Sequence, residues 1–163
     1  GFTHGAVYSN FESKEELFLA LYEQWVAGRV NEIEASWPAD GTLSDRARAV
    51  ADDWIEHFRG DPRAFLLRLE FAVRGAHDGE LQGKLGTRVG AVPLAIHRLL
   101  DDSLDPGDQE AADTAALAIG LQALSIGMAL ELLSNPKAVP PGLAGNLAAR
   151  LVGSFAARES ARP

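Results

Sequence analysis

Residues 1–17, GFTHGAVYSNFESKEEL, predict how the rest of the chain is organised. Thr3 is a good helix N-cap. The residues after it suit a short helix that buries Val7 and Phe11 and exposes His4 and Tyr8. The segment therefore predicts a short helix with polar side chains at its N-terminal end.

Ser13-Lys14-Glu15-Glu16 then predicts the start of a long helix. In such a capping box the Ser13 hydroxyl accepts from the Glu16 amide, and the Glu16 carboxylate accepts from the Ser13 amide. A short helix with exposed polar residues at its start is how a helix-turn-helix protein meets base edges in the major groove. A plain capped helix start is the alternative, but it explains neither Gly5 nor Tyr8.

The whole segment resembles the recognition-helix signature of the tetracycline-repressor (TetR) family of bacterial transcription regulators. The family pattern is roughly Gly-hydrophobic-[Ser/Thr]-x-Gly-x-aliphatic-Tyr-x-[His/Tyr/Asn]-Phe-x-[Ser/Asn]-Lys-[Glu/Asp]-x-Leu, and the chain follows it without a gap. Asn10 stands where the family more often has an aromatic residue or His. The resemblance implies that DNA is read by Thr3, His4, Gly5, Ala6, Tyr8, Asn10 and Lys14, the first four near bases and the last three at phosphates.

The resemblance also implies two domains. We expect residues 1–12 to be the end of a helix-turn-helix head, and residues 13–163 to be a helical ligand-binding and dimerisation domain. Because the sequence begins at the predicted recognition helix, the DNA reader, we expect it to lack the first two helices of the head and to bind DNA poorly.

Composition limits the classes of function. The chain has 163 residues, 47% of them hydrophobic, which is enough for one sizeable core. A net charge of −8 argues against a body that wraps nucleic acid, so DNA binding must come from the head. The absence of cysteine excludes disulfides and fits a cytoplasmic location.

Capping residues, prolines and apolar repeats divide the rest of the chain into helices, which predicts an all-α fold. Pro38 should stop the first long helix, and Pro93 should kink the fourth, where three glycines suggest a close approach or a movement. The helix from 105 to 133 should be the longest, at about 40 Å. The predicted helices start at Ser13, Thr42, Asp61, Asp78, Asp105 and Pro140.

The last two helices carry wide apolar faces and small residues, which predicts a homodimer in which they meet their copies as a four-helix bundle. A larger monomeric core is the alternative. The apolar run from Ala115 to Leu130 is shorter than the roughly 20 residues of a membrane span, so no membrane is expected. The predicted interface comprises Ala116, Gly120, Ala123, Gly127, Leu143, Leu147, Leu151 and Phe155.

A ligand pocket is expected between the middle helices, because concave apolar cavities between helices are usual small-molecule sites. The resembling family places its inducer pocket in this region. Aromatic residues at helical spacing are also typical of plain core, and His97 could be an ordinary half-buried histidine. The candidate pocket residues are Trp54, Phe58, Phe65, Leu69 and His97.

Enzymatic readings have little support. The four histidines show no metal-binding spacing, and no phosphate-binding loop follows a strand, so neither metal nor cofactor is expected. Asp53 and His57 lie one turn apart, but no nucleophile is tied to them, and a solvated ion pair explains them better.

The sequence therefore predicts a non-enzymatic, ligand-responsive transcription regulator. We expect the intact protein to bind operator DNA as a homodimer and to be released by a small apolar or amphipathic effector; repression rather than activation follows from the family alone. The alternative is an all-α small-molecule binding or carrier protein that does not bind DNA.

Overall fold

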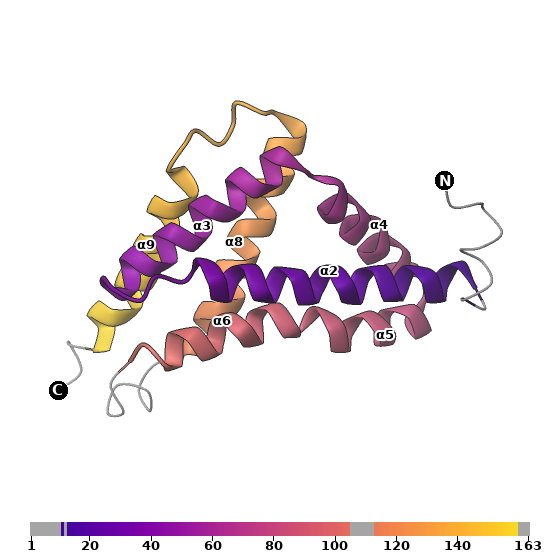
Figure 1. Ribbon diagram of the computed structural model, residues 1–163, viewed down its shortest axis with the longest axis horizontal. Helices are drawn as coiled ribbons and strands as arrows, with labels where there is room; N and C mark the ends of the chain where they lie inside the picture. The colour runs from indigo at the N-terminus through magenta and orange to yellow at the C-terminus, as the bar shows by residue number, and fades with distance from the viewer. Residues whose placement is uncertain (1–10, 12, 105–112, 160–163) are drawn as a thin grey trace.

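The computed structural model describes residue 11 and residues 13–104 and 113–159. Its described residues form helices joined by turns, with no strand among them, so the predicted all-α fold is confirmed. The helices, shown in Figure 1, are α2 (Lys14–Ser36), α3 (Leu43–Gly60), α4 (Arg63–His77), α5 (Gly79–Val89), α6 (Ala91–Asp101), α8 (Thr114–Ser134) and α9 (Leu143–Glu159).

Local capping residues set the helix starts, as the sequence predicts. The Ser13 hydroxyl accepts from the Glu16 amide at 3.0 Å and opens α2. Thr42 and Asp45 form a complete capping box at α3. The Asp61 carboxylate accepts from the Arg63 amide at 3.0 Å where α4 begins. These contacts are made within one turn, which is why they can be read from sequence.

The fourth predicted helix is interrupted rather than only kinked. Asp78 caps α5, whose last residue is Val89, and α6 begins at Ala91. Pro93 has no amide hydrogen to give the Val89 carbonyl, so the helical ladder breaks one turn before the proline. The expected close approach at Gly83 and Gly86 is not found, since no described atom lies within 4 Å of where a Cβ would stand.

The predicted helix from Asp105 to Leu133 is wrong at its start. Residues 105–112 lie outside the described residues, and α8 starts at Thr114 with the Asp113 carboxylate accepting from the Ala116 amide at 3.0 Å. With 21 residues, α8 is shorter than α2, which has 23. The prediction of one continuous helix is therefore wrong, because Asp113, an acidic cap closer to the apolar repeat, precedes α8.

Helix α8 is nevertheless longer than its uninterrupted apolar run. By length and composition it could cross a membrane, with a mean hydropathy of 1.8, and 33% of its most apolar stretch is buried within the protomer. Counting the run from Ala115 to Leu130 therefore underestimated the helix, and its length does not exclude a membrane span. The buried side of α8 carries Thr114, Leu117, Ala118, Met128, Ala129 and Leu132.

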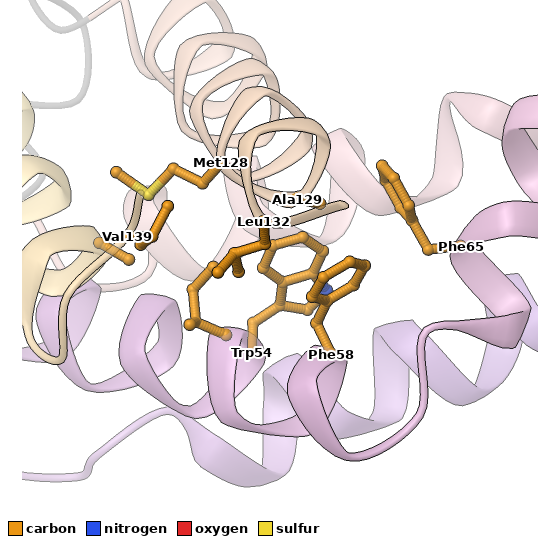
Figure 2. Packing of buried hydrophobic residues seen from close by; sticks show 9 residues of the cluster. Trp54, Phe58, Phe65, Met128, Ala129, Leu132 and Val139 are labelled. Atoms are coloured by element: carbon orange, nitrogen blue, oxygen red, sulfur yellow. The ribbon is translucent and has the colours of Figure 1, made fainter. Parts of the chain in front are cut away.

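Two groups of packed helices, joined by α8, organise the molecule. Helix α2 lies along α5 and α6, and α3 lies along α9, with α8 packed on α6, α9 and α3 (Figure 1). Figure 2 shows Trp54 and Phe58 pointing from α3 toward Ala129 and Leu132 of α8. Helices α2, α3, α4, α6 and α8 together enclose a small cavity.

Candidate functional site

The residues predicted to read DNA are almost all beyond the part of the chain that the structure describes. Thr3, His4, Gly5, Ala6, Tyr8 and Asn10 lie outside the described residues, and Lys14 is the first residue of α2. Their roles stay predictions. The structure does describe α2, the helix that follows these residues, and the helices that α2 contacts.

Two small adjoining cavities lie in the interior. The first, the aromatic cavity, has a volume of about 40 Å³, and the second has about 50 Å³. Both are lined by Arg29 and Ile33 of α2, Ile96 of α6 and Ser125 of α8. The rest of the aromatic cavity is lined by Trp25, Trp54, Phe65, Arg68, Val92, Gln122 and Ile126.

Arg29 is the charged residue at the centre of this region. Its place follows from the α2 repeat, because it lies one turn after Trp25 and one turn before Ile33 on the inward stripe. It is only 8% exposed, its Nη1 donates to Glu32 at 3.1 Å, and its guanidinium lies 5.7 Å from the centre of the Trp54 ring. Burial lowers the pKa of Arg29, and the hydrogen bond and charge of Glu32 oppose that shift.

Arg68 of α4 lies where the aromatic cavity meets a larger hollow of about 350 Å³. This hollow lies between α2, α4 and α5 and is also lined by Tyr22 and Phe71. Burial raises the pKa of the Tyr22 hydroxyl, while the charge of Arg68 and its hydrogen bond to Tyr22 lower it. The lining of the aromatic cavity therefore includes two guanidinium groups, those of Arg29 and Arg68.

The five predicted pocket residues do not form one group. Trp54, Phe58 and Phe65 form an aromatic cluster with ring centroids 5.4–6.2 Å apart, and Leu69 packs beside it. Trp54 and Phe65 line the aromatic cavity. Phe58 lines an adjoining hollow of about 90 Å³, to which Trp54, Phe65 and Arg29 also contribute, together with Glu32 and Asp61.

His97 belongs to a different cluster. Its Nδ1 lies 3.0 Å from the Thr114 hydroxyl, which also donates to Asp101 at 2.5 Å, and its Nε2 lies 3.4 Å from Asp101. These contacts join α6 to the first turn of α8. His97 is therefore an ordinary, half-buried histidine, which is the alternative that the sequence analysis gave beside a pocket role.

The most informative cavity residues were missed from the sequence. Arg29 and Arg68 were not singled out, although a charged residue inside the apolar stripe of α2 is a visible signal. Such a residue is either paired in the interior or directed to solvent, and sequence spacing alone does not decide between them.

The histidine and aspartate considered for catalysis are not paired. His57 lies 3.7 Å from Glu32 of α2, and both His57 and Asp53 are exposed. Among the described residues, no three His, Cys, Asp or Glu side chains gather where they could hold a metal ion.

One face of α8 is open to solvent. It carries Ala116, Ala123 and Gly127, all exposed, and Ile119, which is 61% exposed. Gly120 is half-buried and lies close to Leu151. The α9 residues Leu143, Leu147, Leu151 and Phe155 are half-buried and pack partly against their own protomer.

These features define an all-α domain with small interior cavities and an open apolar face, and comparison with known proteins gives its class. Residues 43–157 match a family described as BetI-type transcriptional repressor, C-terminal, and the chain therefore belongs to the TetR family. The match confirms the family and its non-enzymatic character, and assigns these residues to the ligand-binding and dimerisation domain. It does not include residues 1–17, which carry the resemblance to a recognition helix. No curated protein and no solved structure matches the chain.

Proposed function

We propose that the protein is a transcriptional repressor whose affinity for operator DNA is controlled by a small apolar or amphipathic effector. One observation carries the proposal. Helix α2 begins directly after the predicted DNA reader, and its inward stripe supplies Trp25, Arg29 and Ile33 to the cavity lining. A change in the cavity therefore acts on the helix that holds the reader.

The open face of α8 supports a homodimer. Ile119 at 61% and Leu130 at 43% are exposed on a helix that is apolar almost all round, and such a helix needs a cover. Small residues beside them allow a second backbone to approach closely. A second copy packed against α8 and α9 would supply the cover and fix the spacing between two readers.

The proposed mechanism is a shift between two populated conformations. The two cavities are small, so an effector larger than them must move the helices that line them apart. Lys84 of α5 contacts Glu15 in the first turn of α2 at 2.9 Å and Glu80 at 2.8 Å, which ties the start of α2 to the sensor body. Movement of α2 would then change the separation of the readers. The cytoplasm is the proposed location.

The experiment is a gel shift with the intact protein and duplexes selected from genomic fragments. Tyr8→Phe combined with Lys14→Ala should weaken duplex binding at least tenfold, because two phosphate contacts are lost, and should leave the sedimentation coefficient unchanged. Unaltered binding by this variant would reject the proposed reader. Failure to select any duplex would instead favour the carrier protein without DNA binding.

A further inference from the structure

We propose that the effector is an apolar carboxylate, whose anionic group is held by Arg29 and Arg68 and whose apolar body lies among Trp25, Trp54 and Phe65. This inference rests on the proposed function, because it names the ligand of the same cavity. It goes further because it assigns a negative charge to that ligand.

The cavity lining has an unbalanced positive charge. Among the described residues that line the two cavities there are two arginines and no Asp or Glu. Glu32 accepts from Arg29, but its side chain is 39% exposed and it also lies within 3.7 Å of His57. A guanidinium has five N–H donors, and Glu32 occupies one nitrogen of Arg29, so donors remain for a second acceptor. In a protein with a net charge of −8, this lining is an exception.

Burying a charge is costly, which makes Arg29 informative. Arg29 is 8% exposed and so loses most of its hydration, and it gains in return one hydrogen-bonded carboxylate, the partly exposed Glu32, and the more distant charge of Asp53. An incoming carboxylate can take two parallel N–H bonds from one guanidinium, the geometry for which arginine is suited. The ligand would thereby complete a pairing that the protein leaves incomplete.

The aromatic residues could instead indicate a cationic ligand, since ring faces attract cations. In this protein the Trp54 face is already occupied by the Arg29 guanidinium, 5.7 Å from the ring centre. A second cation would meet two guanidinium groups, and the carboxylate beside them, Glu32, is already hydrogen-bonded to Arg29. The rings therefore serve as apolar surface for the body of the ligand.

The remaining polar residues fit the same assignment. The Ser125 hydroxyl donates to the Leu121 carbonyl at 3.0 Å, so toward the cavity it offers acceptor capacity only. The donors in the lining are therefore the two arginines, the amide of Gln122 and the indole N–H groups of Trp25 and Trp54. A ligand with one acceptor-rich end and an otherwise apolar body matches this distribution.

The test uses three probes of one chain length, octanoate, octanamide and octyltrimethylammonium, titrated into the full chain by calorimetry. Octanoate should bind at least tenfold more tightly than octanamide, and the cation should bind weakest. Equal affinities, a preference for the cation, or no binding of octanoate would overturn the proposal. None of these results would affect duplex selection, which tests the proposed function separately.

Variants locate the charge effect. Arg29→Gln should weaken octanoate binding at least tenfold and leave octanamide binding unchanged. Arg63→Gln is the matched control, because Arg63 is 86% exposed and pairs with Asp61 outside the cavity, and it should bind octanoate like the wild type. If Arg29→Gln does not fold, Arg68→Gln gives the same comparison. Full octanoate affinity in a folded Arg29→Gln and in Arg68→Gln would overturn the assignment.

Discussion

Gly145 shows how one residue sets the contact between the chain's most closely packed helices. Its amide donates to the Asp52 carboxylate at 2.8 Å, which lets α9 lie directly on α3. A Cβ at this position would overlap Asp52 and would stand 2.6 Å from Cγ of Arg48. Only a residue without a side chain permits this approach.

Gly145→Ala should therefore destabilise the protein. Overpacking in a closely packed interface costs about 1–3 kcal/mol, and here the added methyl group also displaces the Asp52 hydrogen bond. Gly28→Ala is the control, since no described atom lies within 4 Å of its Cβ position inside α2, and alanine should stabilise that helix slightly. Urea unfolding of both variants at equal protein concentration measures the difference. Equal stability of Gly145→Ala and wild type would contradict the packing described for α3 and α9.

At the scale of the helix, Asp61, which lies between the end of α3 and the start of α4, makes the stability of the fold depend on pH. Hydrogen bonds from the side chain and the amide of Arg63 lower the pKa of Asp61 from its ordinary value of 3.8 to about 2. Because the pKa is lower in the folded state, the ionised carboxylate stabilises the fold above about pH 4. That stabilisation is lost as the pH falls from about 4 to about 2.

Asp61→Asn should remove this dependence while keeping a side-chain oxygen that can accept from the Arg63 amide. The variant should melt below the wild type at pH 5, and the gap should narrow as the pH approaches 2. Asp40→Asn, in the exposed turn between α2 and α3, is the control for loss of one negative charge. Thermal melts at pH 5, 4 and 3 provide the comparison. A gap that is constant with pH would refute the role given to the carboxylate.

Helix starts could be predicted because their causes are local. Ser13, Thr42 and Asp78 each accept from an amide within three residues, so the sequence contains the whole interaction. The start of α8 could not be predicted, because Asp105 and Asp113 are both plausible caps. The burial of Arg29 depends on how α2 packs against α3 and α6, and no local pattern encodes that packing.

The same distinction holds for the candidate site. Trp54 and Phe65 could be predicted as cavity residues because their helices were predicted correctly, and the aromatic spacing indicates an inward face. The sequence could not show which of the proposed interface residues are exposed in the protomer. Ala116, Ala123 and Gly127 lie on the open face of α8, whereas Leu147 and Leu151 are partly covered by their own protomer.

For the whole molecule, the open face of α8 predicts the oligomeric state. Ile119→Glu should shift the protein from dimer to monomer, because a charge at the centre of an apolar interface is costly to bury. Val73→Glu is a closely matched control, since Val73 on α4 is 62% exposed and Ile119 is 61% exposed. Sedimentation velocity of the two variants measures the effect. Dimers of equal strength in both would contradict an interface on α8.

The central claim is that the cavity controls the DNA reader through α2. The most direct measurement is fluorescence anisotropy of a selected operator duplex bound by the intact protein, with and without saturating octanoate. We predict at least a tenfold loss of duplex affinity with octanoate, and a folded Arg29→Gln variant that binds the duplex but is not released. Duplex affinity that is unchanged while octanoate occupies the cavity would contradict the account.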